Sequence, residues 1–357
     1  MASLEQSPAT GLSAAAAPPR AQLPRWLRDV HPAVWLLAIF LMFLPAFGNS
    51  FIEAQIFGWS FILGMIALSL MFLAGYGGMV SLVQMSVAGL AGYMVPIFGD
   101  SAVSTISLGW PFWAVAPVAI VIAVIFGTVS GALAVRTAGI YTIMITLAIA
   151  SAFFYFTRQN YTIFNGFSGF NAVRAPAFWG VNWRDPAPFY YLTLACAAAS
   201  YAAVLYVART PFGLALQGIR DNPRRMAALG FRVAAHRIAA YAFAAVIAAV
   251  AGVLLVWLNG QISPGTAGIG PVIDILVIAV IGGLRHPIGP FVGALIYVVL
   301  RTFALDMLTS VGLAGERFNL LVGLGFLAIV LFSPDGVVGL WDRWRASRAA
   351  APGPRGS

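Results

Sequence analysis

Lysine is absent from this chain of 357 residues, and all twenty basic residues are arginine. A P-loop ATPase site needs a lysine to reach the β- and γ-phosphates, so the chain cannot carry that site itself. Cys196 is the only cysteine, which excludes an internal disulfide and a cysteine metal cluster. His31, His236 and His286 are isolated from one another and lack the spacing of a zinc site. We therefore expect no catalytic residues, no metal site and no cofactor of the chain's own.

Charge is also scarce, since 9% of the residues are charged and 61% are hydrophobic. Apolar runs of about 20 residues follow one another, and each can cross a hydrocarbon core of about 30 Å. The runs are continuous and do not alternate as in a β-barrel. They predict an all-α, polytopic transmembrane helical bundle of about ten spans. The predicted spans are 33–49, 57–75, 83–98, 111–135, 138–157, 188–208, 238–258, 271–284, 287–305 and 317–333. The short third and eighth segments are candidates for re-entrant segments.

The arginines predict the orientation of this bundle, because basic residues concentrate on the cytoplasmic side. Most of them fall on one side if both termini are cytoplasmic. We therefore expect residues 1–30 to be a disordered basic cytoplasmic tail, 31–340 the transmembrane domain and 341–357 a second basic tail. The net charge of +9 is dispersed between spans, so a nucleic-acid partner is not predicted.

An extracytoplasmic loop is expected at residues 158–187, and it is rich in aromatic side chains. Two interpretations remain open for it. The loop is either a docking surface for an extracytoplasmic partner or an aromatic belt at the membrane interface.

A polar segment rich in arginine, Thr210–Arg237, lies within the predicted cytoplasmic loop 209–237. Asp221 or Asn222 can cap a helix there, and Pro223 suits the first helical position, where no N–H donor is needed. The helix would then run from Arg224 to Leu229, and Gly230 would end it in a left-handed conformation. A short capped helix between two spans is suited to docking a soluble partner.

Two features inside the predicted spans are candidates for a substrate pathway. The segment Gly75–Tyr93 is dense in glycine and contains Ser81 and Gln84, as in the broken helices of transporters. Close packing of helices through small residues explains the same glycines without any substrate. Asp274 is an acid within an apolar run, and intramembrane carboxylates mark a pathway or a structural pair. It could contact a substrate ammonium, relay a proton or pair with an arginine.

Four segments between Leu73 and Leu340 resemble a known family. They are the glycine-rich stretch from Gly75 to Tyr93, Gly139–Tyr141 with Thr146–Ala148, the loop from Phe212 to Gly230 with Ala242–Phe243, and Gly282–Ala294 followed by Leu331–Gly336. On these segments the chain resembles the permease subunits of branched-chain amino acid ABC importers, specifically the larger, M-type subunit. It departs from the family pattern at Pro223–Arg224, where the family usually has an acidic residue.

The resemblance implies a non-enzymatic pore subunit in a bacterial plasma (inner) membrane, crossing it several times. It implies a second permease subunit, identical or different, two P-loop ATPase subunits that use the ATP, and an extracytoplasmic solute-binding protein. Eight residues are expected to couple the chain to the ATPases: Arg220, Asp221, Asn222, Pro223, Arg224, Arg225, Leu229 and Gly230. Ser81, Gln84, Thr146 and Asp274 are the expected pathway residues.

Three alternatives to branched-chain amino acid import remain open. Similar permeases import urea, short amides or aromatic acids. An ion-coupled secondary transporter would use Asp274 as its proton or sodium site. A membrane scaffold would show no solute dependence.

Overall fold

The computed structural model describes residues 41–42, 45, 49–173, 175–178, 181–183, 185–310, 323, 336–337 and 339. The chain divides into two units, Met1–Phe47 and Gly48–Ser357, and all helices and strands named below belong to the second. The expected tails, and almost all of the predicted spans 33–49 and 317–333, lie outside the described residues.

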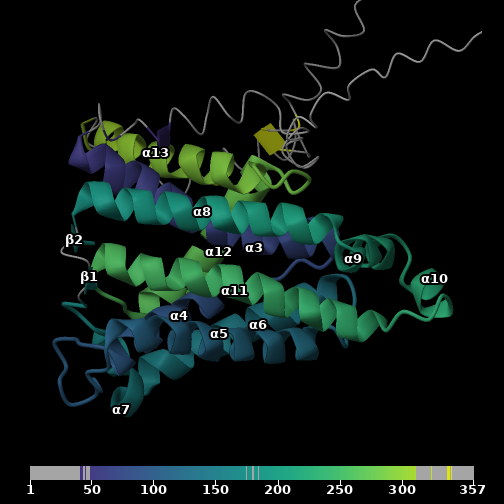
Figure 1. Ribbon diagram of the computed structural model, residues 1–357, viewed down its shortest axis with the longest axis horizontal. Helices are drawn as coiled ribbons and strands as arrows, with labels where there is room; N and C mark the ends of the chain where they lie inside the picture. The colour runs from purple at the N-terminus through teal and green to yellow at the C-terminus, as the bar shows by residue number, and fades with distance from the viewer. Residues whose placement is uncertain are drawn as a thin grey trace, which may run out of the picture. The chain divides into compact units, whose positions relative to one another are not determined.

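Helices make up most of the second unit (Figure 1). The longer ones are α3 (Trp59–Met71), α4 (Gln84–Phe98), α5 (Phe112–Ala134), α6 (Ile140–Gln159), α8 (Pro186–Arg209), α9 (Pro211–Asp221), α11 (Val233–Asn259), α12 (Ile269–Gly282) and α13 (Gly289–Ser310). The short elements are η2 (Ile52–Gly58), η3 (Phe72–Tyr76), α7 (Tyr161–Phe164), η4 (Gly166–Ser168), β1 (Ala177–Phe178), β2 (Val181–Asn182), α10 (Pro223–Ala228) and η5 (Pro264–Ala267). The helix α3 continues in both directions as the π-helical turns η2 and η3.

Five of these helical segments are long and apolar enough to cross a membrane: Ile52–Tyr76, Phe112–Ala134, Ile140–Gln159, Pro186–Arg209 and Val233–Asn259. They confirm the predicted helical membrane fold in the part of the chain that the structure describes. The helices α4 and α12 have 15 and 14 residues and therefore extend about 21–23 Å, less than a bilayer core of about 30 Å. They coincide with the two predicted segments that were candidates for re-entrant segments. The total of about ten spans stays a prediction.

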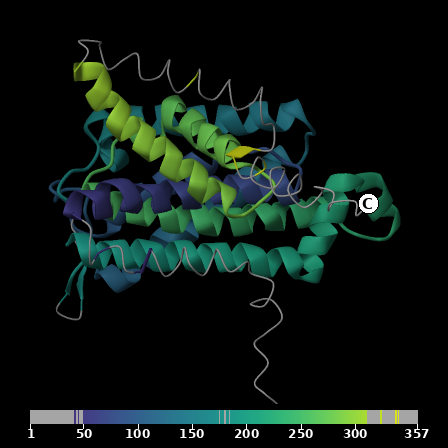
Figure 2. The same cartoon turned by 90° about the horizontal axis from the view of Figure 1, so that it is seen from above.

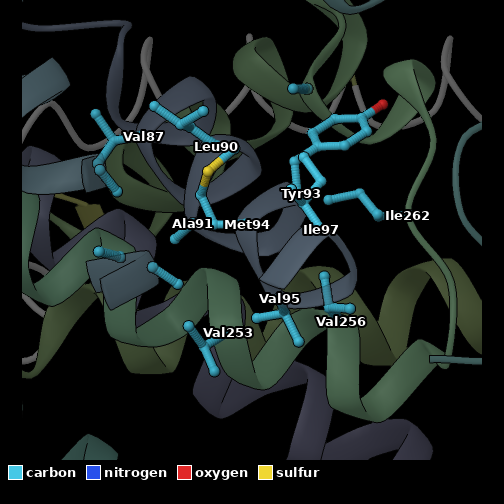
Figure 3. Packing of buried hydrophobic residues seen from close by; sticks show 14 of the residues in the cluster. Val87, Leu90, Ala91, Tyr93, Met94, Val95, Ile97, Val253, Val256 and Ile262 are labelled. Carbon is cyan, nitrogen blue, oxygen red and sulfur yellow. The ribbon is translucent and has the colours of Figure 1, made fainter. Parts of the chain in front are cut away.

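The centre of the second unit is formed by α3, α4 and α11, which pack against one another. The helices α4 and α11 approach closely because Gly252 has no side chain, and a Cβ there would meet the carbonyl group of Ala88. Figure 3 shows Val87, Ala91 and Val95 of α4 facing the helix that carries Val253 and Val256. Small residues that let backbones approach are the usual means of helix packing in membranes.

The helices α5, α6 and α8 lie outside this centre, and each buries one narrow stripe of mostly small residues. The stripe of α5 consists of Val115, Ala119, Ala123, Gly127, Ser130, Gly131 and Ala134. The spacing of three to four residues places these positions on one face of the helix. The opposite face exposes Val121, Ile125, Val129 and Leu133. The helix α5 thus presents large aliphatic side chains to its surroundings and mostly small ones to the centre.

Part of the predicted extracytoplasmic loop is packed into the hydrophobic core. Phe164 and Phe170 are buried and surround the ring of Tyr93, with centroid distances of 5.2 and 6.3 Å. Tyr161 and Phe167 are exposed. Aromatic residues of one loop therefore serve two purposes, and only the exposed ones can contact a partner or a membrane interface.

The two ends of the second unit differ. In Figure 1, α9 and α10 extend beyond one end of α8 and α11, and the hairpin of β1 and β2 lies at the opposite end. Figure 2 shows the yellow-green α13 crossing obliquely over the purple α3, which it contacts.

Candidate functional site

The helix α9 was not expected from the sequence, which predicted one short helix in the polar segment. Its start follows ordinary capping rules, because the Thr210 hydroxyl accepts the N–H of Gly213 at 3.3 Å and Pro211 occupies the first turn. Its buried face consists of Gly213, Ala215, Leu216 and Ile219. The helix is thereby held against the spans and gives α10 a fixed base.

The helix α10 has the predicted caps. Asn222 Oδ1 accepts the N–H of Arg225 at 3.0 Å, and Pro223 occupies the first helical position. Gly230 has a φ of +90°, and the N–H of Phe231 returns to the carbonyl of Met226 at 3.1 Å. Both features end the helix as expected.

None of the residues of α10 is buried, although Pro223 and Met226 are partly covered. Arg224 and Arg225 are exposed on it, and so is Leu229 just beyond its end, with 67% of its surface accessible. A capped helix with basic and apolar side chains facing outward has the chemistry of a docking element.

Arg220 connects α9 to the end of the span Ile52–Tyr76. Its Nη1 donates to the carbonyl oxygen of Gly75 at 2.6 Å, and its Nη2 lies 2.9 Å from Asp221. The last carbonyls of a helix lack partners within the helix, and an arginine commonly supplies one. The side chain of Arg220 also passes over Gly78, which has a φ of +66° and no room for a Cβ beside Arg220 Cγ. Arg220 therefore contacts both Gly75 and Gly78 in the segment that interrupts the span.

Three predicted pathway residues, Ser81, Gln84 and Thr146, lie together at the start of α4. All three are buried. Thr146 Oγ1 accepts the N–H of Leu82 at 3.2 Å, and the Ser69 hydroxyl of α3 donates to Gln84 Oε1 at 3.2 Å. Ser81 lies beside the hydroxyl of Tyr241 in α11. In this conformation Thr146 binds the interrupted backbone and Gln84 ties the start of α4 to α3, as buried polar groups at membrane depth require.

Asp274 lies near the opposite end and lines a cavity of about 290 Å³. The lining residues come from the starts of α3 and α4, the end of α11, η5, α12 and α13, and include Trp59, Leu63, Leu255, Asn259, Tyr297 and Arg301. The Tyr297 side chain interacts with both Asp274 and Arg301. The four predicted pathway residues therefore form two groups, and Met85, next to Gln84 at the start of α4, also lines the cavity beside Asp274.

Several residues of these two regions escaped the sequence reasoning. The contact of Arg220 with Gly75 joins positions 145 residues apart, and no local pattern reports it. Tyr297 and Arg301 did leave a signal, since residues four apart on a helix share a face. Their pairing with Asp274 depends on the packing of α12 against α13.

Metal binding finds no support among the described residues, which contain no group of three His, Cys, Asp or Glu side chains that could hold an ion. Cys196 lies on α8 and is partly buried, as a packing residue would be.

Residues 52–331 match the family described as "Branched-chain amino acid transport system / permease component". Three of the similar curated proteins are named LivM. The chain is 22% identical over 253 residues to the high-affinity branched-chain amino acid transport system permease protein LivM of Escherichia coli (strain K12), a match that covers 64% of this chain and 58% of that protein. It is 25% identical over 232 residues to the probable LivM of Methanocaldococcus jannaschii, covering 62% and 67%.

A third similar protein is BraD of Pseudomonas aeruginosa, a high-affinity branched-chain amino acid transport system permease protein, with 30% identity over 142 residues, or 39% of this chain and 43% of BraD. No solved structure matches the chain. The chain spans just over half the length of the Escherichia coli relative. Because the family match covers most of the sequence and the structure contains five helices of span length, the chain belongs to the branched-chain amino acid transport permease family and is a multi-pass membrane protein.

Proposed function

We propose that the chain is the permease subunit of an ATP-binding cassette importer and forms half of a translocation pathway for branched-chain or related amino acids. The names of the relatives support the solute class. The lack of lysine supports a separate ATPase subunit, because the chain has no residue for the P-loop role. In this proposal the α9–α10 end is cytoplasmic and the chain lies in the bacterial plasma membrane. A second permease, two ATPase subunits and an extracytoplasmic binding protein complete the transporter.

The observation that carries the proposal is the contact between Arg220 and Gly75. It joins α9, which carries the exposed α10, to the interrupted end of a buried span. A hydrogen bond from a charged donor is shorter and stronger than a neutral one, so a displacement of α9 pulls on that backbone. An ATPase that closes against α10 can thus move α3 and the start of α4 together.

Two variants separate docking from transmission. Arg220→Glu replaces the donor with a carboxylate facing the Gly75 carbonyl, so we expect uptake to fall at least tenfold while the ATPase still copurifies. Leu229→Asp places a charge on the exposed end of α10, so we expect the ATPase itself to be lost. Arg136→Glu is the matched control, since Arg136 is exposed in the turn between α5 and α6.

The measurements are ATP-dependent uptake of leucine into vesicles and the amount of ATPase that copurifies with the chain. Full uptake by Arg220→Glu would defeat the transmission role. Uptake that survives deletion of the ATPase gene and collapses with an uncoupler would instead establish an ion-coupled transporter. Wild-type uptake of urea, an amide or an aromatic acid in place of leucine would correct the solute class.

A further inference from the structure

The cavity at the end opposite α9 and α10 combines opposite charges with an apolar wall. Its position follows from the helices that form it, because α11 runs from the α10 end toward Leu255 and Asn259, which line the cavity. Likewise Trp59 and Leu63 belong to the first turns of α3, far from the contact of Arg220 with Gly75. The cavity therefore faces the side from which an importer would receive its solute.

Asp274 and Arg301 both line this space, and no ion pair within 4.0 Å joins them. Within the described residues, the ion pair found within 4.0 Å is that of Arg220 with Asp221. Tyr297 interacts with each of the two charges. Asp274 is half-buried and the Arg301 side chain is exposed, so a ligand with complementary charges can reach both groups.

The size and the walls of the cavity restrict what that ligand can be. A volume of about 290 Å³ is at the lower end of small-molecule sites, so it suits a molecule of amino-acid size and not a peptide. Trp59, Leu63 and Leu255 provide an apolar surface for an aliphatic side chain. Urea and short amides carry no charge for Asp274 or Arg301, and an aromatic acid would bring its carboxylate near Asp274 without an ammonium group.

We propose that this cavity binds a zwitterionic aliphatic α-amino acid, with Asp274 receiving the ammonium group and Arg301 the carboxylate. The ligand replaces Tyr297 as the link between the two charges, and Tyr297 positions them when the cavity is empty. The inference deepens the proposed function by assigning the solute a site within the permease subunit itself.

The test is direct binding to the purified permease–ATPase complex, without the extracytoplasmic binding protein, so that the affinity of that protein does not mask the site. Three ligands of one carbon skeleton are titrated by calorimetry: leucine, leucinamide, which lacks the carboxylate, and 4-methyl-2-oxopentanoate, which lacks the ammonium. The wild-type complex is expected to prefer leucine over either analogue.

Each charge should govern one part of that preference. Asp274→Asn should weaken leucine binding about tenfold or more and remove the preference for leucine over the oxo acid. Arg301→Gln should weaken it similarly and remove the preference over the amide. Asp274→Glu and Arg301→Lys keep the charges and should retain part of the binding. Asp100→Asn and Arg158→Gln remove one charge each from the same end of the molecule and should change nothing.

The outcomes are distinguishable from those of the proposed function. Unchanged leucine binding in both variants, or an equal loss for all three ligands, shows that Asp274, Tyr297 and Arg301 only stabilise the fold, and import by the complex is unaffected by that result. Leucine binding with the expected charge dependence, but without ATP-driven uptake, supports the site and overturns the importer. No leucine binding by the wild-type complex overturns the site.

Discussion

The spans Ile52–Tyr76 and Phe112–Ala134 are both strongly apolar, yet they occupy opposite environments. In their most apolar stretches, 89% of the first is buried and 22% of the second. What separates them is where the small residues lie. The helix α5 concentrates alanine and glycine in a single stripe, so it packs on one face only, whereas α3 is covered on nearly all sides. Hydropathy identifies a span, and the placement of small side chains decides whether it is central or peripheral.

The largest expected effect comes from filling a close approach at the centre. Gly252→Val would place a side chain into the Ala88 carbonyl, so α4 and α11 would have to separate. We expect a loss of about 3 kcal/mol or more, at the upper end for overpacked cores, seen as a lower melting temperature in detergent and a poor yield. Gly270→Val is the matched control, because no described atom lies within 4 Å of a Cβ at Gly270. Equal melting of the two variants would refute the close-packing argument.

An intermediate effect is expected for Thr146→Val, which keeps the shape but removes the acceptor for the buried N–H of Leu82. An unsatisfied buried donor costs about 1–3 kcal/mol, so the melting temperature should fall. Thr128→Val is the control, since the Thr128 hydroxyl donates only to a carbonyl of its own helix, that of Val124 at 2.7 Å. If Thr146→Val instead alters solute preference and leaves melting unchanged, Thr146 lines the pathway as the sequence predicted.

The smallest effect on stability is expected when one valine is shortened, and its size should differ between the buried α11 and the exposed face of α5. Val256 of α11 is fully buried, and Val256→Ala should cost about 1–2 kcal/mol through lost packing. Val129 of α5 has 55% of its surface exposed, and Val129→Ala should change stability by less than about 0.5 kcal/mol. Thermal melting of the two variants in the same detergent tests the difference. A large cost for Val129→Ala would show that the outer face of α5 is covered by a partner chain.

Much of the fold could be predicted from the sequence because continuous apolar runs leave the backbone no alternative to helices in lipid. The residues at which the spans begin and end were harder to predict. The first described span begins at Ile52 and not at 57, and it buries Glu53, a carboxylate that the sequence analysis placed outside the spans. A buried acid near the end of a span looks like a loop residue in a hydropathy pattern.

The candidate site was predicted unevenly. The caps of α10 could be predicted because Asn222, Pro223 and Gly230 act on their own neighbours. The preceding helix α9 was missed, because its 11 residues are too few for a span and lie within a segment interpreted as a polar loop. The roles assigned to the eight coupling residues and to the four pathway residues stay predictions. Contacts such as that of Arg220 with Gly75 depend on tertiary packing, which a single sequence does not report.

The short backbone ladder between Phe170 and Ile262 has a consequence for the rim around the cavity. Each of these residues donates its N–H to the carbonyl of the other at 2.8 Å, and Val173 adds a third bond to Gly260 at 2.9 Å. These hydrogen bonds keep the two segments at a fixed spacing. We therefore expect the loop after α6 and the loop after α11 to move together. Since Asn259 and Ser263 line the cavity, we expect a displacement of the loop that carries the exposed Phe167 to move these two residues as well.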